Sequence, residues 1–290
     1  MNHHLLRSAV IAFLSGFVLV GCLSSDSDDR DVVTVGGGEE QNAGGMMGTG
    51  GAPVVGAGVD DDGDGLDLSA EEAAGTDPAL VDTDGDGYSD GDEVHAGTMP
   101  TDPESVIYQG GWPYNRHKDD IQGPDWESTP EVGTMMPRYQ ALDQYGDTFD
   151  LYDLHDQGKP VVIDVATWFC EPCKALADFF TNGDMAVMDE YGWWRPEYAV
   201  VRDMIENDEI IWITVLYSGG MPVTQEDITR WHDTWPHHKI VVLADSENQL
   251  RDYLSVRAMP RIDILDSALN FTVYYPQGPA LGMRTLVGLE

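Results

Sequence analysis

Cys170 and Cys173 form a Cys-x-x-Cys pair, a spacing that suits redox chemistry. An apolar, β-branched run of strand length begins at Val161 and ends at the aromatics Trp168 and Phe169, and apolar residues at helical spacing follow the pair (Ala175, Leu176, Phe179 and Phe180). The pair is therefore expected at a helix N-terminus, where unpaired N–H groups and the helix dipole favour the nucleophilic thiolate. We expect Cys170 to be the exposed, attacking sulfur. Cys173 lies one turn inside the helix, close enough to form a disulfide with Cys170, and Pro172 suits the first turn.

Strand and helix patterns alternate through the second half of the chain. A short hairpin is predicted from Tyr139 to Leu151, with its turn at Gly146 and Asp147. Further strands are predicted at 209–216, 239–244, 261–265 and 271–275. Helices are predicted at 196–205, at 225–235, up to Leu254 with a capping box of Ser246 and Gln249, and from Ala280. This alternation predicts an α/β fold with helices on both faces of the sheet.

Four features in order along the chain resemble the thioredoxin superfamily. An acid (Asp164) lies six residues before Cys170, an aromatic residue (Phe169) adjoins it, and Cys-x-Pro-Cys-Lys follows. Far downstream, Ala258-Met259-Pro260 precedes a strand-like run. The predicted hairpin is similar to that of the redoxin branch, which includes membrane-anchored thiol–disulfide reductases and peroxiredoxin-like (AhpC/TSA-like) proteins. The resemblance implies a thioredoxin-like fold, in which a central mixed β-sheet carries helices on both faces.

The resemblance also implies roles for individual residues. Pro260 would be a cis-proline that faces the disulfide and helps to bind extended substrate, while Trp168, Phe169 and Met259 would contact substrate. Cys170 would attack a substrate disulfide and Cys173 would resolve the mixed disulfide, with no organic cofactor. Asp164, in an apolar strand, would be a buried acid that exchanges a proton with Cys173. Glu171 would oppose the Cys170 thiolate, which favours a reductase over an oxidase.

Two copies of the pattern D-x-D-x-D-G-x5-E begin at Asp60 and, 22 residues later, at Asp82. This spacing places carboxylates and one backbone carbonyl around a single ion, and these hard oxygen ligands suit Ca²⁺. The period and the Gly-Thr-x-Pro after each copy resemble the thrombospondin type 3-like calcium repeats of bacterial surface proteins, with only short helical pieces beside the loops. The predicted ligands are Asp60, Asp62, Asp64, Leu66 and Glu71, then Asp82, Asp84, Asp86, Tyr88, Asp90 and Glu93.

The N-terminal residues are typical of a signal segment, with Arg7 followed by an apolar core. The run Leu19-Val20-Gly21-Cys22 resembles a bacterial lipobox, which implies that Cys22 is lipidated and is the mature N-terminus. The remaining thiols of the 3 cysteines are then Cys170 and Cys173. By the same resemblance, Leu23 favours sorting to the outer membrane. We therefore expect a lipid-anchored protein of the cell envelope, attached to the membrane through this anchor.

Acidic residues outnumber basic residues 52 to 15, giving a net charge of −37. Such a charge disfavours binding to nucleic acid and to anionic lipid. We expect as partners a protein or small-molecule disulfide and a thiol electron donor. The predicted organisation is a signal peptide (1–21), a flexible acidic Gly/Ser linker (22–58), calcium repeats (59–105), an irregular connection with aromatic residues (106–130) and a thioredoxin-like domain (131–290).

Other functions share part of these motifs. A peroxidase would carry Pro-x-x-x-Thr-x-x-Cys, but Ile163 stands at the proline position. A copper chaperone would use Cys-x-x-x-Cys with a distant histidine; the spacing here is one residue shorter, although His232, His237 and His238 are present. A zinc half-site is disfavoured with two free thiols. The non-enzymatic alternative is a calcium-binding surface lipoprotein in which the cysteine pair is a permanent disulfide.

Overall fold

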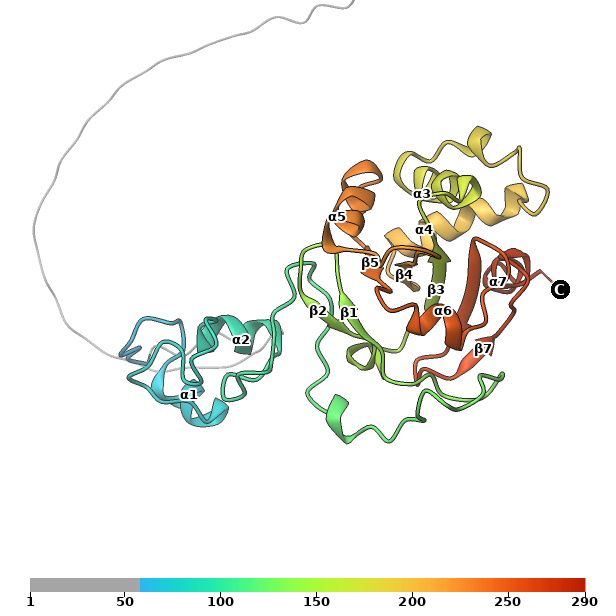
Figure 1. Ribbon diagram of the computed structural model, residues 1–290. Helices are drawn as coiled ribbons and strands as arrows, with labels where there is room; N and C mark the ends of the chain where they lie inside the picture. Colours follow the sequence, from blue (N-terminus) through green and yellow to red (C-terminus); the bar gives the residue numbers. More distant parts are fainter. Residues whose placement is uncertain (1–57, 290) are drawn as a thin grey trace, which may run out of the picture. The chain divides into compact units, whose positions relative to one another are not determined.

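The computed structural model describes residues 58–289 (Figure 1). The expected signal peptide, the lipidation site Cys22 and the linker up to residue 57 lie outside the described residues. Among residues 58–289, no helix has the length and apolar character needed to cross a membrane.

The repeat region contains two short helices, α1 (Leu68–Ala74) and α2 (Asp90–Ala96). Asp67 and Ser89 cap their N-termini, and each helix ends at a left-handed glycine, Gly75 or Gly97. Seven-residue helices are too short for an EF-hand pair, as the sequence indicated.

Residues 106–130 contain one short 3₁₀ helix, η1 (Lys118–Asp120), and otherwise follow an irregular path. The buried carboxylate of Asp153 holds this segment on the domain that follows. It accepts hydrogen bonds from the Tyr108 hydroxyl (2.5 Å) and the Asn115 backbone (2.8 Å), and pairs with Lys118 Nζ (2.9 Å). This buried charge network, which sequence patterns did not reveal, acts together with aromatic contacts, such as the Trp112 indole N–H to Asp143 (2.8 Å) and Trp126 against Tyr139.

The domain begins with the predicted hairpin, β1 (Gln140–Leu142) and β2 (Thr148–Asp150), which pair antiparallel. Gly146 lies in the turn with φ +100°, a conformation that favours glycine. A 3₁₀ turn, η2 (Leu151–Leu154), leads from the hairpin to the main sheet.

The main sheet has five strands in the order β5-β4-β3-β6-β7. Its strands are β3 (Val161–Ala166), β4 (Ile211–Leu216), β5 (Ile240–Ala244), β6 (Arg261–Leu265) and β7 (Phe271–Val273). β3, β4 and β5 run parallel, whereas β6 pairs antiparallel with both β3 and β7. The helices are α3 (Glu171–Asn182), α4 (Val200–Glu206), α5 (Gln225–Thr234), α6 (Gln249–Tyr253) and α7 (Ala280–Leu286), with the 3₁₀ turns η3 (Met185–Val187) and η4 (Pro196–Ala199). This mixed sheet with helices on both faces is a thioredoxin-like fold.

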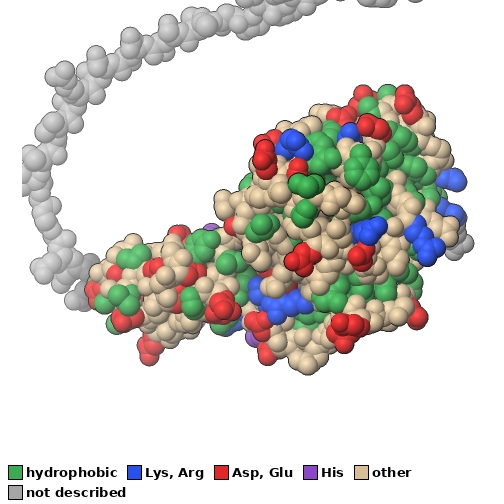
Figure 2. Space-filling model, viewed as in Figure 1, with side chains coloured by type: hydrophobic (Ala, Val, Ile, Leu, Met, Phe, Trp, Pro, Cys, Tyr) green, Lys and Arg blue, Asp and Glu red, His purple; other side chains and the backbone are tan. Residues whose placement is uncertain are grey.

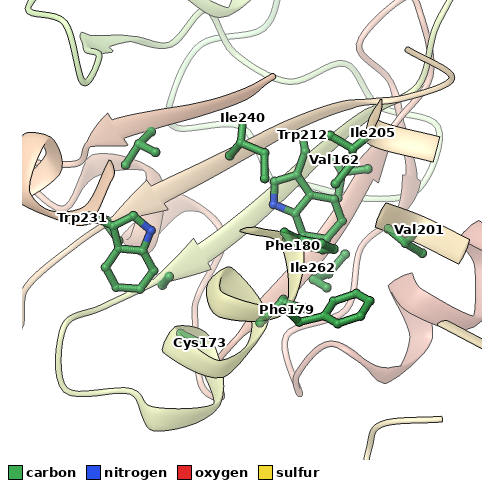
Figure 3. Packing of buried hydrophobic residues seen from close by; sticks show 14 of the residues in the cluster. Val162, Cys173, Phe179, Phe180, Val201, Ile205, Trp212, Trp231, Ile240 and Ile262 are labelled. Carbon is green, nitrogen blue, oxygen red and sulfur yellow. The ribbon is translucent and has the colours of Figure 1, made fainter. Parts of the chain in front are cut away.

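Two buried clusters lie on opposite faces of the sheet because neighbouring strand residues point to opposite sides. One cluster joins alternate strand residues to α3, α4, α5 and α7, and the other joins the remaining strand residues to α6 and the hairpin. In the first cluster, Phe180 of α3 packs edge-on against Trp212 of β4 with ring centroids 4.7 Å apart (Figure 3). This packing fixes α3, and with it the Cys-x-x-Cys pair, on the sheet.

The predicted capping box of α6 is wrong. Ser246 donates its hydroxyl to the Val223 carbonyl (2.6 Å), and Asn248 takes the N-cap position without a side-chain cap. The Asp245 carboxylate instead accepts from the backbone N–H groups of Leu250 and Arg251 (3.2 and 2.8 Å). The hydrogen bond from Ser246 to Val223, which is distant in sequence, thus replaces the predicted capping interaction. The strands predicted from residue 209 and to residue 275 are also shorter, beginning at Ile211 and ending at Val273.

Candidate active site and calcium sites

Cys170 and Cys173 form a disulfide at the N-terminus of α3, with an S–S distance of 2.08 Å. Cys170 is the N-cap residue, and its Sγ accepts the Cys173 backbone N–H at 3.2 Å. Pro172 occupies the first turn, where its missing N–H costs no hydrogen bond. The predicted position of the pair at the start of a helix is confirmed.

The expectation that Cys170 is exposed is wrong for the disulfide form. Cys170 is 6% exposed and Cys173 is 1% exposed, and both belong to a buried cluster against which Trp168 and Met259 pack. The neighbouring Phe169 is 66% exposed instead. Cys170 is therefore recessed beside an exposed aromatic ring.

Asp164 lies in the centre of β3 and is 4% exposed, so it is buried as expected. Its Oδ2 accepts a long hydrogen bond (3.4 Å) from the hydroxyl of Thr214, its neighbour on β4, whereas Oδ1 has no protein partner. Burial raises the pKa of Asp164 to about 7, and the hydrogen bond from Thr214 opposes the rise. A carboxyl group with this pKa can both take and release a proton near neutral pH.

A small cavity of about 10 Å³ adjoins Asp164, enough for roughly one water molecule. Thr181 of α3 and His237 also line it, and Thr181 Oγ1, like Asp164 Oδ1, is buried without a hydrogen-bond partner. His232 of α5 lines the cavity as well, and burial lowers the pKa of both histidines. These histidines thus lie beside the buried acid. Among the described residues, the only groupings of three or more metal-binding side chains contain aspartates alone.

The Met259–Pro260 peptide bond is cis and directly precedes β6. Val165 of β3 pairs with Arg261, so the register brings Pro260 to the end of β3 that leads into the Cys-x-x-Cys segment. The structure therefore brings the cis-proline, far downstream in sequence, to the strand that carries Asp164 and leads into the cysteine pair.

Trp168 is held by residues of α5 and by its C-cap residue Trp235, none of which was predicted to belong to the site. Its indole N–H donates to the Asp227 carbonyl (3.3 Å), and the Arg230 guanidinium lies 4.4 Å from its ring centroid. Trp231 and Trp235 pack against it at 5.2 and 5.7 Å. Trp231 and Trp235 are four residues apart in the sequence, about one helical turn, and this spacing is the signal that could have placed both on one face of a helix.

The repeat region brings its carboxylates together in two groups. Asp60, Asp62 and Asp64 form one cluster and Asp82, Asp84 and Asp86 the other, with oxygens within 4.8 Å of one another. The backbone N–H groups of Leu66 and Tyr88 donate to Asp64 and Asp86, at 2.7 and 2.9 Å. Both loops therefore have the compact form that a cation would require.

The glutamates at position 12 of the loops show most clearly that a cation fits. Glu71 and Glu93 are 1% and 0% exposed, yet neither oxygen of either side chain has a hydrogen-bond partner. Burial and the neighbouring aspartates raise the pKa of both, to about 7 for Glu93. Because unpaired buried carboxylates are costly, a divalent cation with oxygen ligands fits these positions.

Asp90 is placed differently from the other predicted ligands. Its two oxygens accept from the backbone N–H and the hydroxyl of Thr83 (2.8 and 2.6 Å), and it lies outside the aspartate cluster of its loop. Its observed contacts thus order the second loop through Thr83.

Comparison with known families supports the repeat assignment. The family model for the bacterial TSP3 repeat matches residues 60–80 and 82–103. The resemblance seen in this region is confirmed. The two matches coincide with the two aspartate clusters and their short helices.

The search of curated proteins found no match. Among solved structures, a putative thiol:disulfide interchange protein from Chlorobium tepidum is 15% identical, with 55% of this chain and 94% of that chain covered and a TM-score of 0.39. A secreted Mycobacterium tuberculosis disulfide oxidoreductase is 16% identical (52% and 92% covered, TM-score 0.36). The exposed lipoprotein thioredoxin of Streptococcus pneumoniae is 18% identical (48% and 89% covered, TM-score 0.34).

Proposed function

We propose that this protein is a lipid-anchored thiol–disulfide oxidoreductase of the cell envelope, whose catalytic domain is joined to its anchor by calcium-binding repeats. The observation that supports the catalytic proposal best is the Cys170–Cys173 disulfide at the first turn of α3, with the buried Asp164 on the strand that leads into it and the cis-proline beside the end of that strand.

The proposed reaction is a reversible exchange of disulfides. In the reducing direction, the Cys170 thiolate attacks one sulfur of a substrate disulfide, which breaks the substrate S–S bond and releases one thiolate. Cys173 then loses its proton to the Asp164 carboxylate and attacks Cys170, so the second substrate thiol leaves and the protein disulfide forms. A thiol electron donor restores the dithiol. Pro260, Met259, Trp168 and Phe169 would contact the substrate.

The proposed net direction is reduction. Glu171 follows Cys170 directly and its carboxylate is 73% exposed, which disfavours the neighbouring thiolate. Lys174 pairs with Glu171 at 2.8 Å and offsets part of this effect. The midpoint potential therefore distinguishes the directions: about −270 mV corresponds to a thioredoxin-like reductase and about −120 mV to a disulfide-forming oxidant.

The proposed binding of Ca²⁺ would involve the two aspartate clusters with Glu71 and Glu93. Bound ions would neutralise carboxylates that are otherwise crowded and buried, so they would supply folding energy to the repeats. Attachment to the outer membrane, with the repeats as a spacer, is the proposed location. It rests on the lipobox-like run that ends at Cys22.

The activity can be tested by insulin reduction with dithiothreitol as the electron donor. Cys170→Ser should abolish the activity, whereas Cys173→Ser should leave a mixed disulfide on Cys170 that mass spectrometry can detect. Met185→Ser, at an exposed residue outside the site, is the matched control and should retain full activity. If the Cys170→Ser protein reduced insulin as fast as the wild type, the non-catalytic alternative would be favoured.

A further inference from the structure

A pocket of about 220 Å³ lies beside the residues that lead into Cys170. Thr167, Trp168 and Phe169 form the side nearest the cysteine, and α5 contributes Asp227 and Arg230. The loop after β4 completes the pocket with Tyr217, Ser218 and residues 221–223. A group bound here would lie close in space to any sulfur that reacts with Cys170. We call this hollow the Trp168 pocket.

One side of the Trp168 pocket is rigidly held. The indole of Trp168 is fixed by its hydrogen bond to the Asp227 carbonyl and by packing against Trp231. Arg230 lies on the ring and also pairs with the Asp227 carboxylate at 3.0 Å. A preformed apolar surface loses little entropy when a ligand binds, so it can contribute to affinity.

Large apolar side chains at the rim of the pocket are exposed to solvent. Met221 is 81% exposed and Phe169 is 66% exposed, the highest values for large apolar residues in the thioredoxin-like domain as the structure describes it. Exposed apolar surface around a hollow is typical of an interaction site, and a methionine can adapt its shape to different partners. The pocket therefore suits a bulky apolar group.

Charge argues against small anionic disulfides as the partner. The chain has a net charge of −37, and acidic side chains are spread over the face that Figure 2 shows. Near the pocket, Asp227 and Glu171 are each paired with one cation, Arg230 and Lys174, so the local charge does not offset the net negative charge of the chain. A small disulfide such as glutathione disulfide carries net negative charge, so the protein repels it, whereas an apolar side chain of a polypeptide meets no such repulsion.

We propose that the Trp168 pocket receives a bulky apolar side chain adjacent to the reacting cysteine of a polypeptide substrate. The protein thereby selects polypeptide disulfides over small anionic disulfides. This inference rests on the proposed oxidoreductase function and specifies its substrate class.

The test uses the full-length reduced protein and follows single-turnover oxidation by its tryptophan fluorescence. The probes are two symmetrical peptide disulfides that differ in having Phe or Gly before the cysteine, and glutathione disulfide. In each reaction the protein dithiol becomes a disulfide and the probe becomes two thiols. We expect the Phe peptide to react about tenfold faster than the Gly peptide, the discrimination typical of one filled apolar pocket, and faster still than glutathione disulfide.

Two pocket variants and one control complete the test. Ser218→Trp should fill the pocket and bring the Phe/Gly rate ratio to about one, and Met221→Ser should lower the ratio about threefold. Met185→Ser should leave the ratio unchanged. Equal rates with both peptides, or a wild-type ratio in Ser218→Trp, would overturn the inference while leaving the oxidoreductase function intact. If no probe oxidises the protein, the proposed function itself fails.

Discussion

At the scale of single residues, burial controls the chemistry of Asp164. Its pKa of about 7 lies above the unfolded value of 3.8, so the folded protein keeps this proton over a pH range in which the unfolded chain has lost it. The group therefore destabilises the folded state progressively as the pH rises from about 4 to about 7, by on the order of 4 kcal/mol. Asp164→Asn should increase the free energy of unfolding by a few kcal/mol at pH 8 and hardly at all at pH 4.

Urea denaturation of the oxidised wild-type protein and the oxidised Asp164→Asn variant, each at pH 4 and pH 8, measures this difference. Other buried acids, such as Asp153 and Asp245, also have raised pKa values, but they are common to both proteins and cancel in the comparison. An equal gain at both pH values would show that the effect comes from packing rather than from titration.

At the scale of elements, β6 depends on a buried ion pair directly after the cis-proline. Arg261 and Asp263 are both 0% exposed, and the guanidinium makes two hydrogen bonds to the carboxylate (2.6 and 3.1 Å). Arg261 also donates to the Leu254 carbonyl and lies 4.9 Å from the Tyr274 ring. Asp263→Ala should lower the free energy of unfolding by about 3–5 kcal/mol, because it leaves an uncompensated charge in the interior.

Urea denaturation again provides the measurement, and Glu171→Gln is its control. That variant removes one partner of an exposed ion pair and should cost less than about 1 kcal/mol. Similar losses for the two variants would mean that the β6 pair is no more important than a surface pair.

At the scale of the whole molecule, the repeats and the thioredoxin-like domain should owe their stability to different interactions. The repeats bury little apolar surface, with Leu66 as their one fully buried large apolar residue among those described. Their stability should therefore depend on Ca²⁺, whereas the thioredoxin-like domain has an apolar core on each face of its sheet. Removing Ca²⁺ with a chelator should make residues 58–105 sensitive to proteases and leave insulin reduction unchanged.

Limited proteolysis with and without Ca²⁺, read by mass spectrometry, checks this prediction. Mg²⁺ is the control ion, because its small octahedral coordination sphere fits such loops less well. Identical cleavage in all conditions would contradict a structural role for Ca²⁺, and a loss of activity on chelation would show that the two regions are coupled.

Much of the site could be predicted from sequence because its signals are local. The position of Cys170 and Cys173 at the start of a helix follows from the strand before them and the apolar spacing after them. The carboxylate clusters follow from a fixed spacing within each loop. In each case, residues a few positions apart determine the structure.

The sequence by itself thus determined the order of the elements, the thioredoxin-like resemblance and the two acidic loops. Only the tertiary structure showed that Cys170 is recessed, that Thr214 is the partner of Asp164, and that Ser246 bonds to Val223 instead of capping α6. It also formed the Trp168 pocket from three separate segments of the chain. These features depend on contacts between residues distant in sequence, whose burial and pairing arise when the sheet and its helices pack together.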